Sequence, residues 1–126
     1  MINLDSPAIE IFVPGMPIAK QSFRMAWTNG KAVGYQKETV RSWQAMVSAS
    51  AIQAAGINPV LGRLSIVLDF FIPYNKADID NLSKAVLDGL QGIIFENDRQ
   101  VFHLSAKKTI TKEKLGVLIK VEKLKC

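Results

Sequence analysis

Asp78 and Asp80, one residue apart, are the side chains of this sequence whose spacing first suggests chemistry. They stand between an alternating apolar run, "RLSIVLDFFIP", and a helical pattern that contains "NLSKAVLDGL". Aspartate is frequent at helix starts because its carboxylate accepts hydrogen bonds from the unpaired backbone N–H groups of the first turn. We expect Asp80 to cap the helix in this way, whereas Asp78 lies outside it and repels Asp80 unless a cation separates them. Two hard oxygen ligands suit Mg²⁺ or Mn²⁺, and an ordinary helix start is the alternative.

Other ionisable residues could complete a site around this pair. At about 100° per residue, Lys84 and Asp88 follow Asp80 on the polar side of the predicted helix, opposite its apolar stripe. Asp98 ends the segment "FEND" and precedes a strand predicted from residue 100. If that strand lies beside "RLSIVLDFFIP", the carboxylates of Asp78, Asp80 and Asp98 converge. The alternative is that "END" is an ordinary polar turn with no part in a site. Asp88 either orients Lys84 or is its solvated partner one turn away.

Length and composition bound the class of protein. The chain has 126 residues, 48% of them hydrophobic and 21% charged, which fits one folded domain with its own core. It contains no apolar run of the roughly 18 residues that a membrane span requires, and its start, "MINLDSPAIEIF", lacks the pattern of a secretion signal. We therefore expect a cytoplasmic protein with no membrane partner. The single cysteine, Cys126, excludes a disulfide framework or a cysteine-based zinc site within one chain.

The net charge of +5 is unevenly distributed along the chain. Residues 99–126 hold eight basic residues against two acidic ones, whereas residues 78–98 hold five acidic residues against one lysine. Basic surface favours polyanions such as nucleic acid, but the acidic segment repels them unless a cation intervenes. The segment "IAKQSFRMAWTNGKAVGY" also interleaves basic and aromatic side chains, a pattern that can hold phosphates and stack on bases. Lysines that only keep the protein soluble are the competing explanation.

The periodicity of apolar residues predicts the elements that position these groups. Strands are expected at residues 9–13, 63–73, 100–110 and 115–122, helices at residues 37–55 and after residue 80, and a loop or loose hairpin over residues 18–35. The last two strands are most simply a hairpin joined through "TKEK". This order predicts a single α+β domain, in which a mixed sheet of about four strands carries two helices on one face.

Five stretches of the sequence resemble the RusA family of Holliday junction resolvases, endonucleases that cut four-way DNA junctions. In chain order they are "VPGMPIAKQSFR", "GYQKETVRSWQAMV", "DIDNLSKAVLDGLQG", "NDRQVFHLSAKK" and "GVLIKVE". The string Asp-x-Asp-Asn-Leu-x-Lys, followed by an acidic residue before Gln-Val, is far more specific than Asp-x-Asp alone. The resemblance implies a single RusA-like endonuclease domain over residues 1–126.

The resemblance also implies roles for particular residues. Catalytic residues are implied at Asp78, Asp80, Lys84 and Asp98, the three aspartates as metal ligands, with Asp88 and Asn97 in support. DNA contacts are expected at Lys20, Arg24, Lys76, Lys107 and Lys108. Asn97 stands where the usual family pattern has an acidic residue, which leaves the number of metal sites open. Mg²⁺ is the implied cofactor, with Mn²⁺ as an alternative, and a homodimer acting on four-way junction DNA is the implied assembly.

Three functions compete on the sequence alone. The first is a metal-dependent, structure-selective endodeoxyribonuclease that resolves Holliday junctions by paired symmetric cuts in DNA recombination and repair. The second is a module that binds branched DNA with weak or no cleavage, which the missing acid at Asn97 makes reasonable. The third is a nonspecific or RNA-directed nuclease, which would cut linear duplex or RNA at comparable rates.

Overall fold

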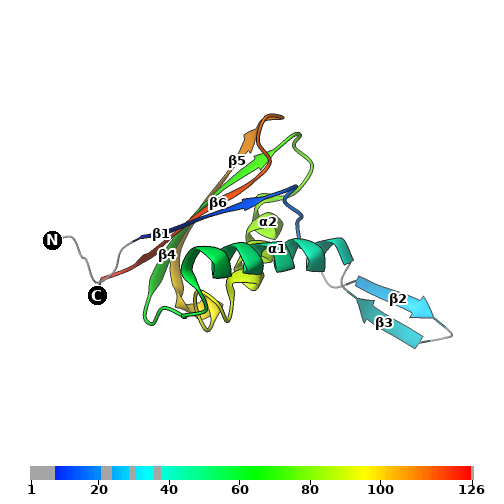
Figure 1. Cartoon of the computed structure of the whole chain (residues 1–126). Coiled ribbons are helices and arrows are strands. Elements are labelled where there is room, and N and C mark those ends of the chain that lie inside the picture. Colours follow the sequence, from blue (N-terminus) through cyan, green and yellow to red (C-terminus); the bar gives the residue numbers. More distant parts are fainter. Residues whose placement is uncertain (1–7, 21–23, 29–30, 36–37, 126) are drawn as a thin grey trace.

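Residues 8–20, 24–28, 31–35 and 38–125 are described by the computed structural model of the chain, the second and third of these ranges by their backbone alone. The predicted turn at Asn29-Gly30 and the single cysteine, Cys126, lie outside the described residues. Two helices and a four-stranded sheet form the layers of the domain, and a further two-stranded hairpin is separate from that sheet; Figure 1 shows the helices lying along one side of the sheet and the hairpin extending away from it.

Four strands form the main sheet, in the order β1-β6-β4-β5. They are β1 (Ile9–Pro14), β4 (Leu64–Ile72), β5 (Val101–Ile110) and β6 (Gly116–Lys123). β6 pairs antiparallel with both β1 and β4, whereas β5 runs parallel to β4. A second sheet pairs β2 (Arg24–Thr28) with β3 (Lys31–Tyr35) in antiparallel fashion, within the stretch predicted as a loop or loose hairpin. The predicted mixed sheet of four strands is therefore confirmed.

Alternation of apolar residues explains which face of the main sheet is covered. In β4, every second residue is buried: Leu64, Ile66, Leu68, Phe70 and Ile72. β6 repeats the pattern with Val117, Ile119 and Val121. Because successive side chains of a strand point to opposite faces, these residues form one apolar face that a second layer must cover.

Two helices supply that layer, α1 (Glu38–Ala55) and α2 (Ile79–Leu90), and both lie on the same face of the sheet (Figure 1). Their apolar buried residues recur three or four positions apart, which places them on one side of each helix. They are Val40, Trp43, Val47 and Ala51 in α1, and Leu82, Ala85, Val86 and Leu90 in α2. The predicted α+β arrangement with two helices on one face is confirmed. No helix in the described residues is long and apolar enough to cross a membrane.

Gly89 allows the two helices to pack closely. A Cβ at this position would lie 2.9 Å from Val47 Cβ and 3.0 Å from the Gln44 carbonyl oxygen. Ser48 Oγ also donates a hydrogen bond of 2.7 Å to the Gly89 carbonyl. Glycine in a helix interior costs roughly 1 kcal/mol relative to alanine, so its presence here is best explained by the space that it leaves between α1 and α2.

Gly89→Ala is expected to lower the free energy of unfolding by about 1–3 kcal/mol, because the added methyl group overfills the contact between α1 and α2. The gain in helix propensity, roughly 1 kcal/mol, offsets only part of this cost. Urea unfolding followed by circular dichroism measures the change. In a Val47→Ala background the same substitution should cost somewhat less, since Val47 Cγ1, 2.9 Å from the added methyl group, is then absent, whereas Val47 Cβ and the Gln44 carbonyl oxygen still crowd it. An equal loss in both backgrounds would contradict the packing explanation.

The predicted hairpin between the last two strands is wrong. β4 lies between β5 and β6, and each of them pairs with β4. Burial explains this order, because β6 carries three buried branched residues whereas β5 is exposed along most of its length and forms an edge. Edge positions favour strands with charged residues, and β5 contains Lys107 and Lys108. The five residues between the strands pass over the end of β4, where the Thr111 N–H donates to the Ile72 carbonyl at 2.8 Å.

Candidate active site

A pocket of about 380 Å³ lies between α2 and β5 and brings together three of the four residues expected to be catalytic. Its lining comprises Ile79, Asp80, Ser83, Lys84 and Leu87 from α2, Leu104 and Ala106 from β5, and Asp98 from the segment before β5. Asp80, Lys84 and Asp98 are exposed. The pocket therefore combines apolar walls with three charged groups that a large substrate can reach.

The start of α2 differs from the expectation by two residues. Asp78, rather than Asp80, is the N-cap residue, and its extended backbone lets its carbonyl accept a hydrogen bond of 3.0 Å from the Leu82 N–H. The Asp78 side chain makes no capping hydrogen bond. Asp80 lies in the first turn, where its carboxylate accepts a hydrogen bond of 2.9 Å from the Asn81 N–H. The prediction that Asp80 caps the helix is wrong, and the Asp78 carboxylate is left free of capping.

Two of the charged residues on the polar side of α2 line the pocket, and a third, Asp88, lies outside it. Asp80 and Lys84 share the pocket because residues four positions apart lie only about 40° apart around the helix axis. A further step of about 40° carries Asp88 away from the pocket, where Lys20 Nζ donates to its carboxylate at 2.6 Å and Gln44 Nε2 lies 3.5 Å from the same oxygen. Asp88 thus pairs with Lys20 and not with Lys84. Lys84 forms no ion pair or hydrogen bond with the residues that the structure describes.

Lys108, which we expected to contact DNA, reaches from β5 to the loop before α2. Its Nζ donates a hydrogen bond of 2.6 Å to the Asn75 side-chain oxygen and one of 3.0 Å to the Ala77 carbonyl. These bonds hold the loop that leads to Asp78. The Asp78 side chain is exposed and is not part of the pocket lining.

The other residues expected to contact DNA are spread over the domain. Lys76 is exposed in the loop before α2. Lys107 lies on the face of the sheet that the helices leave uncovered, 3.6 Å from the Asp69 carboxylate. Arg24 begins β2, where only the backbone is described. Lys20 is half-buried in its ion pair with α2. DNA contact by these residues stays a prediction.

Asp98 reaches the pocket by a route that the sequence did not predict. β5 does lie beside β4, but the two strands are parallel, so Asp98 precedes the end of β5 that pairs with the start of β4. Asp78 follows the opposite end of β4. The expected meeting of three carboxylates at one end of the sheet is therefore wrong. α2 runs back along the sheet between those ends, and so it carries Asp80 and Lys84 toward Asp98.

Asn97 stands where the family pattern has an acidic residue, and its side chain is hydrogen-bonded to the neighbouring Arg99. Its Oδ1 accepts a hydrogen bond of 2.9 Å from the Arg99 N–H and lies 3.4 Å from Arg99 Nε. Asn97 is in this way the N-cap of a short 3₁₀ helix, η1 (Asp98–Gln100). It does not line the pocket.

The donors of the pocket suit a hard divalent cation in one particular mode of binding. Within the described ranges, no group of three or more aspartate, glutamate, histidine or cysteine side chains lies close enough to hold a metal ion. Mg²⁺ is usually bound through one or two carboxylates, while waters and substrate phosphates complete its shell. Asp80 and Asp98 on one open pocket fit that mode, although they do not form a closed metal site.

The apolar walls of the pocket were not predicted from the sequence. Leu104 and Ala106 lie on the side of β5 that faces α2, and Leu104 is 43% exposed on this edge strand. They alternate with His103 and Ser105, which point to the other face. An apolar alternation in a strand otherwise rich in polar residues is the signal that could have identified them.

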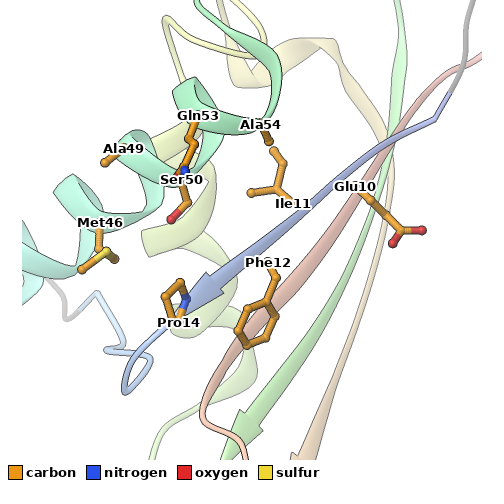
Figure 2. Close-up of a pocket in the computed structure, with 9 residues that line it drawn as sticks. All are labelled: Glu10, Ile11, Phe12, Pro14, Met46, Ala49, Ser50, Gln53 and Ala54. Atoms are coloured by element: carbon orange, nitrogen blue, oxygen red, sulfur yellow. The ribbon is translucent and has the colours of Figure 1, made fainter.

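A second pocket, of about 480 Å³, lies between β1 and α1. Figure 2 shows Met46, Ser50 and Gln53 of α1 on the side of this pocket opposite β1. Glu10 is the one ionisable residue among those that line it, and Figure 2 shows its carboxylate on the side of β1 away from the helix. This pocket offers a phosphate neither a cation ligand set nor a basic group, so the pocket beside α2 is the candidate active site.

Comparisons with known proteins identify the family to which the chain belongs. Residues 14–122 match the family model described as endodeoxyribonuclease RusA. The chain is 27% identical over 116 residues to the crossover junction endodeoxyribonuclease RusA of Aquifex aeolicus (strain VF5), with 90% of each chain covered. The matched residues include both helices and the whole pocket beside α2. The chain therefore belongs to the RusA family of endodeoxyribonucleases.

Proposed function

We propose that this protein is an Mg²⁺-dependent endodeoxyribonuclease that cuts four-way DNA junctions as a homodimer. Family membership supports the class of reaction, and the name of the Aquifex relative, a crossover junction enzyme, supports the substrate. The observation that carries the proposal is the pocket that Asp80, Lys84 and Asp98 line together. Two carboxylates and an amine around an open space are suited to phosphodiester hydrolysis.

Asp80 and Asp98 are the residues that would hold the cation, whereas Asp78, the third carboxylate that the resemblance implies, is not among the residues that line the pocket. When bound, Mg²⁺ supplies an activated water and positive charge for the phosphate and the leaving oxygen. Mn²⁺ accepts the same oxygen ligands and is the alternative cofactor. Residues 78–98 hold five acidic side chains against one lysine, so this segment repels the DNA backbone until its charge is neutralised.

Lys84 contributes positive charge and hydrogen-bond donors in the same pocket. Its side chain is exposed and free of other partners in the described part of the chain. An ammonium group there can donate to a phosphate oxygen, whose negative charge grows in the transition state, or can position the attacking water. The side chains of Leu104 and Ala106, which line the same pocket from β5, carry no acceptor that competes for those hydrogen bonds.

The homodimer is proposed on grounds of symmetry. A four-way junction has approximate two-fold symmetry, and its resolution requires two cuts. A two-fold dimer presents one site to each cutting position, whereas one chain carries one set of Asp80, Lys84 and Asp98. Sedimentation equilibrium of the protein alone and with junction DNA measures the number of chains in each particle.

Incubation with an end-labelled four-way junction tests the proposed activity. We expect paired nicks at symmetric positions in two strands when Mg²⁺ is present, and no product when EDTA removes it. Linear duplex DNA and RNA of the same length and sequence serve as controls. Cutting of those controls at comparable rates would mean a nonspecific or RNA-directed nuclease and would contradict the proposal.

A module that binds branched DNA without cutting it is the second candidate. The capping role of Asn97 favours it, because the oxygen that would replace the acid of the family pattern already accepts a hydrogen bond from Arg99. Junction binding with no product at any concentration of Mg²⁺ or Mn²⁺ would establish this function instead.

A further inference from the structure

Gln100 uses both ends of its side-chain amide to join two loops. Its Oε1 accepts hydrogen bonds from the backbone N–H groups of Glu96 and Asn97, at 2.9 Å and 3.1 Å. Its Nε2 donates to the carbonyl oxygens of Val60 and Gly62, each at 2.9 Å. A glutamine amide has two N–H donors and one oxygen with two lone pairs. All four positions are therefore used, and a reversed amide would lose every one of these bonds.

The two loops flank the start of the parallel strands β4 and β5, where Asp98 enters the pocket. Residues 60–62 precede β4, and residues 96–98 precede β5. Phe95 is fully buried and anchors the chain on one side of the Asp98 segment. Beyond Phe95, Glu96 and Asp98 are exposed, and no residue of η1 is buried. Burial therefore does not hold the residues that carry the Asp98 carboxylate.

Other hydrogen bonds of this segment are local. The Arg99 N–H donates to the Asn97 side chain, and the Gln100 N–H donates to the Asn97 carbonyl at 3.0 Å. These bonds shape the turn, but they do not attach it to the rest of the domain. The two bonds from Gln100 Nε2 to Val60 and Gly62 attach it to the loop before β4. On the other side of Phe95, the Val60 N–H donates a bond of 2.7 Å to the Ile94 carbonyl, which holds the same loop to the start of the segment.

We infer that Gln100 is a positioning residue for Asp98. Its amide fixes the backbone on both sides of residues 96–98 and so sets where the Asp98 carboxylate stands relative to Asp80 and Lys84. The inference rests on the proposed function, in which Asp98 is a cation ligand. Residues that orient metal ligands through hydrogen bonds commonly change metal affinity or activity by roughly 10- to 100-fold when they are replaced.

Gln100→Glu is the sharpest test, because it keeps the size of the side chain and one acceptor oxygen. It replaces the N–H donors with an oxygen that faces the carbonyls of Val60 and Gly62. We expect faster amide hydrogen exchange at residues 96–98, and a decrease of roughly 10- to 100-fold in both Mn²⁺ affinity without DNA and turnover of the junction. Junction affinity in cation-free buffer should weaken only slightly, because the added carboxylate repels the DNA backbone. Gln53→Glu makes the same change of charge at an exposed residue of α1, away from the pocket, and should alter none of these.

Combination with Asp98→Asn shows whether Gln100 acts through Asp98. In that background Gln100→Glu should cause no further loss of Mn²⁺ affinity or turnover, since the ligand that it positions is already gone. Equal losses with and without Asp98→Asn would overturn the inference. So would wild-type Mn²⁺ affinity in a variant whose amides at residues 96–98 exchange rapidly.

Two further outcomes separate this inference from protein stability and from the proposed function. Thermal melting detects an unfolded variant; if Gln100→Glu does not fold, Gln100→Met, which loses the same bonds without adding charge, carries the same expectations. A wild-type protein that binds junctions but never cuts them would contradict the nuclease, while the Mn²⁺ measurements still decide the role of Gln100. Wild-type Mn²⁺ affinity in Asp98→Asn would overturn the inference itself.

Discussion

Asp80→Asn is expected to abolish cleavage of a four-way junction, while binding of the junction in cation-free buffer stays equal or becomes tighter. Asp80 is exposed in the pocket that it shares with Lys84 and Asp98. Asparagine keeps the shape of the side chain and one oxygen, but it loses the negative charge that would attract the cation. The same loss removes a charge that repels the DNA backbone. Gel-based cleavage with Mg²⁺ and fluorescence anisotropy in EDTA measure the two effects separately.

Glu113→Gln provides the matched control, because it makes the same change of charge at an exposed position in the connection between β5 and β6. It should leave both cleavage and binding unchanged. If Asp80→Asn still cuts near the wild-type rate, the assignment of the cation site to this pocket is wrong. A parallel loss of binding and cleavage would instead mean that Asp80 supports the fold or the DNA contact.

Lys84→Ala is expected to lower turnover by about 10²- to 10³-fold, the usual effect of removing one donor that stabilises charge in a transition state. Affinity for the junction should change little, because Lys84 is one charge among the 16 lysine and arginine residues of the chain. Single-turnover cleavage at saturating protein gives the rate, and anisotropy in cation-free buffer gives the affinity.

Two variants define what Lys84 contributes. Lys112→Ala removes the same charge from the connection after β5 and should retain wild-type turnover. Lys84→Arg keeps the charge on a planar group of different reach, so we expect it to recover only part of the activity. A loss confined to affinity would place Lys84 among the DNA-binding residues and would exclude a part in the chemical step.

The elements of the fold could be predicted because their apolar residues repeat with the period of their own backbone. A strand predicted at residues 63–73 is β4 at Leu64–Ile72, and a helix predicted at residues 37–55 is α1 at Glu38–Ala55. Strand order could not be predicted in the same way. β5 and β6 both alternate and lie five residues apart, which favours a hairpin locally. The insertion of β4 between them depends on the burial of β6 in the whole sheet.

The candidate site likewise has one part that local sequence patterns predict and one part that depends on the fold. Asp80 and Lys84 could be placed together because helix geometry relates them directly. The nearness of Asp98 depends on the parallel pairing of β4 with β5 and on the path of α2 between them, and no local pattern encodes either. The pairing of Lys20 with Asp88 also joins residues 68 positions apart. Sequence patterns identify candidate lysines, but only the fold shows whether each lysine is exposed to solvent, placed to contact DNA or paired with a carboxylate.

The central position of β6 affects how the chain can fold while the ribosome is still synthesising it. β6 is the last strand of the main sheet in chain order, yet it is the neighbour through which β1 joins β4 and β5. Until residues 116–123 have emerged, β1 has no strand partner in that sheet. Pairings between distant parts of a chain form slowly. A nascent chain therefore holds Asp80, Lys84 and Asp98 before it has the complete sheet that supports them, and we expect the site to form only after the last strand has been translated.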